Sequence, residues 1–306
     1  MKTKLTRMLP DLVFAIIIFL SIYMGYPLVG KILLAVYFLY LIYKSLPAIY
    51  ATAGGNAYKK GNKEKALTYF KKAANSKNAK ANFISSYGYL LLRDGKITES
   101  EPYLEKAVEL DDKLPQIKYS SLLNLSLLRW KQGRIPEAIK IAEDLKPNYL
   151  NSVVYEVLGY YYISNGNYKK AKAFNEEALL YDEDDDVIKD NMAQTHYFLS
   201  EYEEAEKIYS KIVPDVAFPE AYYYYALIKI EMGEIDEAKK LLEVALSKKV
   251  SFMSNINEEI IKNKLNEINS LSELKSIDEP NNPDDLNNLD DLNNLDDLHT
   301  KDQSEN

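Results

Sequence analysis

Two long apolar runs open the chain. Residues 12–30 are nineteen consecutive uncharged positions, and residues 32–43 add twelve more, with Lys31 alone between the two runs. A helix that crosses the roughly 30 Å hydrocarbon core of a bilayer needs about 20 predominantly apolar residues. The two runs together are too long for one such helix, so they predict a membrane anchor that occupies residues 1–46.

A break near the middle divides this segment. Residues 25–27, Gly-Tyr-Pro, interrupt the apolar pattern, because glycine and proline favour turns over helix interiors. We therefore predict two transmembrane helices, at about residues 10–26 and 28–46, that form a hairpin. Asp11 follows a proline, and we assign it to the start of the first helix, where a carboxylate complements the helix dipole.

Positive charge flanks both ends of the predicted hairpin. Because lysine and arginine are enriched in cytoplasmic loops, both termini are expected in the cytoplasm, with the turn near Lys31 outside. The chain is then a multi-pass membrane protein, and an uncleaved hairpin on a lysine-rich, cysteine-free chain suits a bacterial cell membrane. A cleaved signal peptide and an array on the extracytoplasmic side are the alternatives. The flanking cations are Lys2, Lys4 and Arg7 before the hairpin and Lys44, Lys59 and Lys60 after it.

A pattern of small and turn residues occurs six times in the middle of the chain. In each unit a small residue is followed seven positions later by a turn residue, and five positions after that by a second small residue. Successive units are offset by 34, 38, 33, 34 and 33 residues. The first small residues are Gly54, Gly88, Ser126, Gly159, Ala193 and Ala226, and the turn residues are Gly61, Gly95, Gly133, Gly166, Ser200 and Gly233.

Each unit is predicted to form two amphipathic helices of about a dozen residues. Small residues fit where two helix axes cross closely. Glycine ends the first helix because it adopts the left-handed conformation that other residues resist. One helix pair cannot bury its apolar face alone, so neighbouring pairs must stack. The pattern therefore predicts an all-α solenoid.

The repeat resembles the tetratricopeptide repeat (TPR). Over about residues 47–247 this resemblance implies a right-handed TPR solenoid of about six helix pairs, preceded by the transmembrane hairpin. The chain departs from the family pattern at Ser126, where the family has glycine, and at Ser200, which replaces a turn glycine. Four extra residues between the second and third units predict a longer loop near Pro115. The fourth unit matches the family best, at Tyr155, Leu158, Gly159, Tyr162, Gly166, Tyr168, Ala171 and Ala178.

Two further segments follow the repeats. Residues 248–277 are expected to supply a capping helix, whose helical pattern begins near residue 255, because a solenoid must cover its last apolar surface. Residues 278–306 contain an Asp-Asp-Leu-Asn-Asn-Leu repeat, in which leucine at every third position forms no stable apolar face. We predict a disordered acidic tail there. A short docking motif and a weak attraction for calcium are the alternative roles of this tail.

Composition argues against catalytic chemistry. The chain has no cysteine and two histidines, and it lacks the glycine-rich, serine and zinc motifs of common enzymes. We expect no enzyme activity, cofactor, metal site or small-molecule substrate. The net charge is −8, but residues 276–306 alone contribute −9, so charge gives no support for nucleic-acid binding. We interpret His196 as packed or exposed, and the acidic run at residues 182–186 as a solvated loop that starts the next helix, with a cation or a basic partner as the alternative.

The TPR resemblance also implies a binding face. In the family the first helix of each pair lines a concave groove, and transfer by register makes this groove aromatic; Tyr155, Tyr162 and Tyr225 are assigned to packing instead. The family's clamp for acidic peptides is absent, because its positions hold Ser85, Tyr89, Leu123, Leu127, Glu156 and Tyr160. The expected ligand is an apolar helix or an extended segment of another protein. The predicted groove residues are Tyr58, Tyr89, Arg93, Leu127, Trp130, Lys131, Tyr160, Ile163, Tyr197, Phe198 and Tyr223.

These observations favour a membrane-anchored TPR scaffold that mediates protein–protein interaction at the cytoplasmic face of the membrane. Tethering raises the effective concentration of the groove near partners in the same membrane. Two other functions stay open. One is a structural spacer or oligomerisation protein without a groove ligand, and the other is an enzyme with an unrecognised site.

Overall fold

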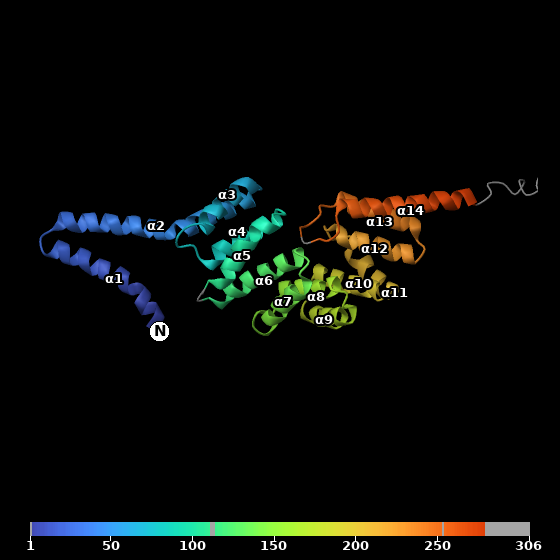
Figure 1. The fold of residues 1–306 in the computed structure, drawn as a ribbon, viewed down its shortest axis with the longest axis horizontal. Helices are drawn as coiled ribbons and strands as arrows, with labels where there is room; N and C mark the ends of the chain where they lie inside the picture. Colours follow the sequence, from blue (N-terminus) through green and yellow to red (C-terminus); the bar gives the residue numbers. More distant parts are fainter. Residues whose placement is uncertain (1, 111–113, 253, 279–306) are drawn as a thin grey trace, which may run out of the picture. The chain divides into compact units, whose positions relative to one another are not determined.

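The chain is all-helical in the part that the computed structural model describes, which is residues 2–110, 114–252 and 254–278 (Figure 1). Fourteen helices and no strand occur in these ranges. Most of the acidic tail predicted at residues 278–306 lies outside them. The helices are α1 (Lys2–Tyr23), α2 (Pro27–Lys59), α3 (Lys63–Ala74), α4 (Ala81–Arg93), α5 (Ile97–Glu109), α6 (Pro115–Lys131), α7 (Ile135–Tyr149), α8 (Ser152–Ser164), α9 (Tyr168–Tyr181), α10 (Asp186–Phe198), α11 (Tyr202–Ile212), α12 (Pro219–Glu231), α13 (Ile235–Ser247) and α14 (Glu258–Asp278).

The helices form two compact units. The N-terminal unit, Met1–Asn191, contains α1 to α9 and the start of α10, and the C-terminal unit, Met192–Asn306, contains the rest of α10 and α11 to α14. Within the N-terminal unit the predicted pairs are α2–α3, α4–α5, α6–α7 and α8–α9, and each pair packs together. In the C-terminal unit α12 packs on α13, and α14 packs on α13.

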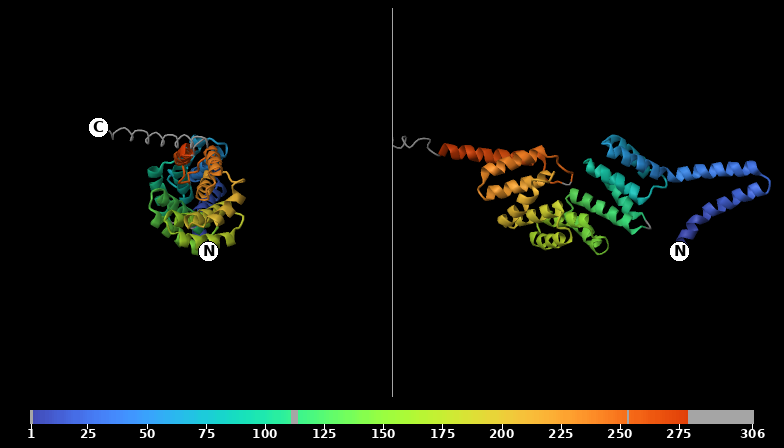
Figure 2. Two further views of the ribbon diagram at one scale, coloured as in Figure 1. Left: turned by 90° about the vertical axis from the view of Figure 1, so that its right-hand side faces the viewer. Right: turned by 180° about the vertical axis from the view of Figure 1, so that it is seen from behind.

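Helices α1 and α2 form a hairpin that is joined by a short turn at residues 24–26 (Figure 2). Near the turn, Gly30 lies so close to α1 that an added Cβ would be 2.4 Å from Cγ1 of Ile22. Farther along, Nζ of Lys44 lies 4.0 Å from Oδ2 of Asp11. The assignment of Asp11 to the helix start is wrong, because α1 already begins at Lys2. Its carboxylate therefore has a lysine partner within the hairpin, in place of a helix N-terminus.

Only one of the described helices is long and apolar enough to cross a bilayer. It is α2, whereas the apolar segment of α1, Asp11–Tyr23, is shorter. At 1.5 Å per residue the latter extends about 20 Å, less than the roughly 30 Å of a typical hydrocarbon core. The hairpin of helices is present, and its two membrane crossings stay a prediction.

Helix α2 continues from the apolar segment into the first repeat. The helix end predicted at residue 46 is wrong, since α2 ends at Lys59 and contains Pro47 in its interior. Proline lacks the backbone N–H of a helical hydrogen bond and therefore often ends a helix. Here the packing of α3 against α2 holds the helix together beyond the proline.

The small residues of the repeat occupy the helix crossings that the sequence predicts for them. A Cβ added to Gly88 on α4 would lie 2.8 Å from Cγ of Leu104 on α5, and one added to Gly54 on α2 would lie 2.8 Å from the ring of Phe70 on α3. Cβ atoms essentially never approach other atoms so closely, so only glycine fits these crossings. The predicted role of the small positions is confirmed here.

The turn positions all have the left-handed backbone conformation. The five turn glycines have φ values from 72° to 81°, and Ser200, at φ 60°, is the one residue other than glycine with positive φ in the described part of the chain. A residue with a Cβ pays roughly 1–2 kcal/mol for this conformation. Ser200 therefore stores strain that the other turns avoid.

Ser200→Gly is expected to stabilise the C-terminal unit by about 1 kcal/mol, because glycine takes the left-handed conformation without a steric cost. Urea unfolding of the full chain, followed by circular dichroism, measures the change. Ser210→Gly, at an exposed interior position of α11, is the matched control. It should destabilise by about 0.5 kcal/mol because glycine is a poor helix former. A loss of stability in Ser200→Gly would contradict the assignment of strain.

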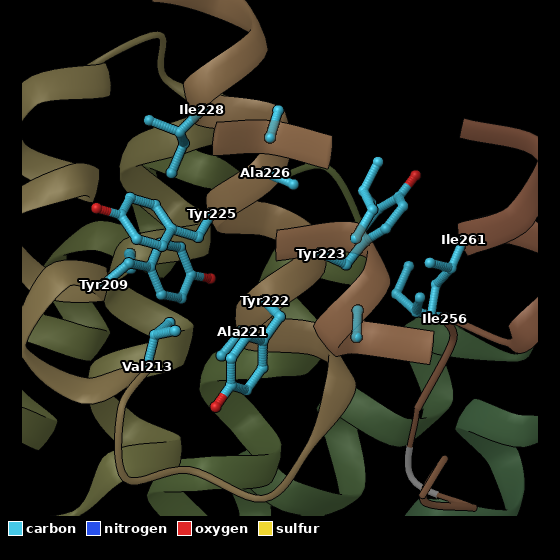
Figure 3. Close-up of a cluster of buried hydrophobic side chains, with 14 of the residues drawn as sticks. Tyr209, Val213, Ala221, Tyr222, Tyr223, Tyr225, Ala226, Ile228, Ile256 and Ile261 are labelled. Carbon is cyan, nitrogen blue, oxygen red and sulfur yellow. The ribbon is translucent and has the colours of Figure 1, made fainter. Parts of the chain in front are cut away.

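The C-terminal unit has one hydrophobic core that α11 to α14 share (Figure 3). Tyr209 on α11 and Tyr225 on α12 stack with ring centroids 5.9 Å apart. Tyr223 lies on the opposite side of α12, toward Ile256 and Ile261. The helix predicted near residues 255–277 is present as α14, and its Ile261 and Ile268 belong to the same core.

Candidate functional site

The eleven residues predicted to line a groove lie on the first helices of the repeats, and they differ in exposure. Seven are partly or fully exposed. The other four are only 4–8% exposed, so neighbouring helices cover them, and they contribute packing more than a contact surface. Helix register shows which side a residue lies on but not whether the next repeat covers it. The four buried residues are Leu127, Trp130, Ile163 and Tyr223.

A first group, the Arg93 cluster, consists of Tyr58 on α2 and Tyr89 and Arg93 on α4. The guanidinium carbon of Arg93 lies 5.6 Å from the ring centroid of Tyr58 and 5.8 Å from that of Tyr89. Burial raises the pKa of Tyr89, and the positive charge of Arg93 partly offsets this rise. A cation above aromatic rings is held electrostatically. The cluster therefore presents an exposed positive charge on an ordered aromatic base.

A second group, the Trp130 cluster, joins α6 to α8. Nζ of Lys131 lies 4.4 Å from the ring centroid of Trp130, whose ring meets Tyr160 edge-on at 5.4 Å. Nε1 of Trp130 donates a hydrogen bond of 3.2 Å to Oγ of Ser164. With its N–H paired and only 4% of its surface exposed, Trp130 forms the base of the cluster. Tyr160 and Lys131 are half-buried and form the part of the cluster that reaches the surface.

The C-terminal unit has an aromatic group of its own. The ring of Tyr197 lies 5.1 Å from Phe198, 5.7 Å from Tyr224 and 6.1 Å from Tyr202, measured between centroids. Burial raises the pKa of Tyr197 to about 12. Tyr224 is half-buried and was not among the predicted residues, although its ring contacts those of the predicted Tyr197 and Phe198. Tyr223 instead enters the core beside α14.

Glu156 on α8 is a carboxyl group with a strongly shifted pKa. Burial, together with the nearby carboxylates of Asp185 and Asp182, raises its pKa to about 7. Oδ1 of Asp185 accepts hydrogen bonds from the backbone N–H groups of Val187 and Ile188, at 2.8 and 3.1 Å. The acidic run therefore caps α10, as predicted, and its charge keeps Glu156 partly protonated at neutral pH.

Glu156→Gln is expected to remove part of the pH dependence of the stability of the N-terminal unit. Because the pKa of Glu156 is raised from 4.5 to about 7 on folding, its protonation stabilises the fold below pH 4.5. This contribution is lost as the pH rises to about 7. Glutamine stays neutral, so the variant should be more stable than the parent at pH 8, by about 1 kcal/mol after allowance for partial exposure, and similar at pH 4.

Urea unfolding of the full chain between pH 4 and 8 tests this expectation. Glu176→Gln, on the exposed face of α9, makes the same chemical change away from the acidic loop. The difference between the two variants should grow with pH. Equal stability changes at pH 4 and pH 8 would show that Glu156 ionises in the folded chain as it does in the unfolded chain.

A set of buried polar pairs was not predicted from the sequence. In each of the third to sixth repeats, the residue three positions after the first small residue forms hydrogen bonds with one or two glutamates. Nζ of Lys229 donates a 2.9 Å hydrogen bond to Oε2 of Glu234 and another to Glu206. Burial lowers the pKa of Lys229, but these bonds outweigh it and the pKa is raised. The pairs are Arg129 with Glu101 and Glu105, Tyr162 with Glu143, His196 with Glu201, and Lys229 with Glu206 and Glu234.

These pairs are structural. Arg129 and Lys229 are buried beneath second helices, and their acids come from adjacent helices or turns, so each pair fixes the distance between neighbours. Alignment of the six repeats would have found them, because a donor follows each of four small residues at the same spacing. Within the described residues, no group of three or more His, Cys, Asp or Glu side chains could hold a metal ion. The side chains that reach the surface at the site are aromatic rings and cations. Such groups are suited to binding apolar and acidic side chains of a partner.

Comparison with protein families matches three stretches of the chain to the tetratricopeptide repeat. They are residues 88–149, 153–185 and 220–248. A TPR repeat-containing protein of Methanocaldococcus jannaschii is 35% identical over 97 residues, which are 31% of this chain. The match spans 28% of the relative's length, so most of that protein has no counterpart in the match.

Solved structures share the fold. A tetratricopeptide repeat protein from Parabacteroides merdae has a TM-score of 0.50 and 18% identity, with 73% of this chain and 99% of that chain covered. PilF of Pseudomonas aeruginosa has a TM-score of 0.53 and 18% identity, covering 66% and 91%. The Cut9–Hcn1 hetero-tetramer of the APC/C has a TM-score of 0.60 and 14% identity, covering 75% and 45%. At these identities the likeness concerns the fold alone.

Proposed function

Because this chain is a tetratricopeptide repeat protein, we propose that it is a membrane-anchored scaffold that binds another protein on the first helices of its repeats. The fold favours protein–protein interaction over catalysis. The observation that carries the proposal is the aromatic and cationic side chains that reach the surface on successive first helices. Tyr58 and Arg93 are exposed, and Lys131 and Tyr160 are half-buried. Aromatic residues and arginine dominate the binding energy of protein interfaces.

The ligand that fits these side chains is an apolar helix or an extended segment. Tyrosine rings offer a large contact area with little loss of rotamer freedom. Arg93 and Lys131, held over aromatic rings, add sites for an acidic group on the same segment. In the C-terminal unit Phe198 and Tyr224 offer a further apolar contact.

The hairpin of α1 and α2 supports the anchor. Its apolar side chains are uncovered, with Phe19, Leu28 and Leu39 between 65% and 71% exposed. From Pro27 to Lys44, α2 extends about 27 Å, close to the thickness of a hydrocarbon core. Contacts between α1 and α2 near both ends of the hairpin support a crossing of the same bilayer by α1. The flanking cations favour the cytoplasmic side for the repeats.

Site-specific photo-crosslinking tests the binding face. A photoreactive amino acid replaces Tyr160 or Tyr224 in the full chain, and the cells that express it are irradiated. The matched control position is Leu180, which is 91% exposed on the second helix α9. We expect the same discrete adduct from the first-helix positions and none from Leu180. Adducts of equal yield at all three positions would contradict a specific face, and their absence would favour a structural spacer.

Thiol labelling tests the anchor, and the chain has no cysteine to interfere. Single cysteines are placed at Lys31, near the hairpin turn, and at the exposed Leu180. Intact cells then receive a membrane-impermeant thiol reagent. Labelling at position 31 but not at position 180 is expected. The reverse result would place the repeats outside the cytoplasm, and no labelling at either position would mean that the turn does not cross the membrane.

A further inference from the structure

The first repeat differs from the others in charge. Residues 59–80, which include α3 and the loops on either side of it, contain eight lysines and one glutamate, a net charge of +7. Residues 81–275, by contrast, contain 24 basic and 34 acidic residues, a net charge of −10. All eight lysines are exposed, and within the described part of the chain none of them forms an ion pair. They are Lys59, Lys60, Lys63, Lys65, Lys71, Lys72, Lys77 and Lys80.

The fold positions two of these lysines, Lys77 and Lys80, near the end of the apolar segment of α2. Helix α3 packs against α2, and the loop that follows α3 contacts α2 at Lys44, where the apolar run ends. Nδ2 of Asn78 donates a 2.7 Å hydrogen bond to the backbone carbonyl of Lys44. Lys77 and Lys80 are close in sequence to Asn78 and share this loop. The loop therefore lies at the level where α2 leaves its apolar stretch.

A second contact ties the end of α3 to the same helix. Nζ of Lys72 lies 5.8 Å from the ring centroid of Tyr50 on α2 and 5.9 Å from that of Tyr69 on α3. Tyr50 is six residues beyond Lys44, less than two helical turns. Because α2 is one unbroken helix from Pro27 to Lys59, the position of this basic surface relative to the apolar segment is fixed.

We propose that the basic surface of the first repeat, at Lys71, Lys72, Lys77 and Lys80, binds the anionic lipid headgroups of the leaflet from which α2 emerges. This inference rests on the proposed membrane anchor. Lysines near a charged bilayer surface are attracted to acidic lipids and act within about a Debye length of it. The lipid contact and the unbroken helix together hold the first repeat close to the membrane and fix its tilt, while the acidic later repeats stay free for a protein partner.

The number of lysines at the surface predicts how strongly anionic lipid should favour the membrane-bound state of the first repeat. Each lysine near an anionic surface contributes about a fivefold factor to the equilibrium between bound and released states, so three lysines contribute roughly 100-fold. High salt reduces this attraction, because the Debye length falls from about 10 Å at 0.1 M to about 3 Å at 1 M.

The test uses the full chain in vesicles. A cysteine at the exposed position Asn75, at the end of α3, carries a fluorescent donor, and a small fraction of the lipid headgroups carries an acceptor. Energy transfer is compared between vesicles of phosphatidylcholine and vesicles with 30% phosphatidylglycerol. The variant Lys71→Gln/Lys77→Gln/Lys80→Gln removes three cations from the surface. Lys211→Gln/Lys240→Gln/Lys249→Gln removes three exposed cations from the C-terminal unit and is the matched control.

We expect transfer at least twofold higher in the anionic vesicles, with the increase abolished by the first variant or by 1 M salt and kept by the control variant. Equal transfer in the two lipids, from chain that resists an alkaline wash of the vesicles, would overturn the inference but leave the anchor intact. Loss of the chain in the wash would instead refute the proposed anchor. If the increase appeared only after removal of residues 279–306, the acidic tail would be the partner of the lysines in the full chain, and the lipid proposal would be wrong.

Discussion

Trp130→Ala is expected to destabilise the N-terminal unit by about 3 kcal/mol or more, as deletions of buried aromatic side chains do. The sequence pattern alone predicts a milder result, because it places Trp130 on the binding face. In the structure Trp130 is 4% exposed, its N–H is hydrogen-bonded to Ser164, and its ring packs on Tyr160 and Tyr161. Its removal leaves a cavity between α6 and α8 and an unpaired Ser164.

Tyr160→Ala should behave differently, because Tyr160 is half-buried and borders the surface. We expect a loss of stability of about 1 kcal/mol and, if Tyr160 is an interface anchor, a loss of about 2 kcal/mol in partner binding. Urea unfolding followed by circular dichroism gives the stabilities, and crosslinking yield at matched folded fraction gives the binding. Tyr155→Ala, at a buried position of the same helix α8, is the packing control.

The comparison has a clear negative outcome. If Trp130→Ala unfolds no more easily than Tyr160→Ala, the indole is not part of the core, and the exposed position that the sequence pattern implies is correct. If Tyr160→Ala is as damaging as Tyr155→Ala, the aromatic side chains of α8 are all core, and the binding face must lie elsewhere.

The repeat itself was predictable because backbone geometry restricts its key positions. A helix crossing as close as that of Gly88 with Leu104 admits no larger residue, and a left-handed turn such as Gly233 favours glycine. Such positions recur with the spacing of the structure and are visible in one sequence. Tyr155, Tyr162 and Tyr225 were also correctly assigned to packing, since all three are buried.

The predictions that were wrong or missing concern contacts between helices, which the sequence of a single helix does not determine. The second apolar helix was predicted to end at residue 46, but contacts with α3 and its loop keep α2 continuous through Pro47. Tyr223 has the register of a groove residue and becomes core because α14 covers it. The polar pairs of Arg129 and Lys229 join different helices, so neither partner looks unusual in its own segment. In each case tertiary contacts between neighbours decide the outcome.

The second large effect is expected at α14, which completes the core of the C-terminal unit. Ile261 and Ile268 are 0% and 2% exposed, and they share a core with Tyr223 and Leu242. Ending the chain after Ser254 removes both isoleucines and Ile256. At roughly 1.5–3 kcal/mol for each buried side chain, the loss is about 5 kcal/mol or more. That is comparable to the total stability of many small domains, so the unit should unfold at low urea.

The matched control ends the chain after Asp278, where α14 ends, and removes only the acidic tail. It should unfold like the full chain, because the residues that form the core are all retained. Ile261→Ala, a milder change in the full chain, should cost about 2–5 kcal/mol, as large-to-small core substitutions do. Circular dichroism during urea unfolding measures all three. If both truncations lowered the unfolding midpoint equally, α14 would not cap the repeats. If in addition Ile261→Ala had no effect, the surface of α12 and α13 would be stable without a cover.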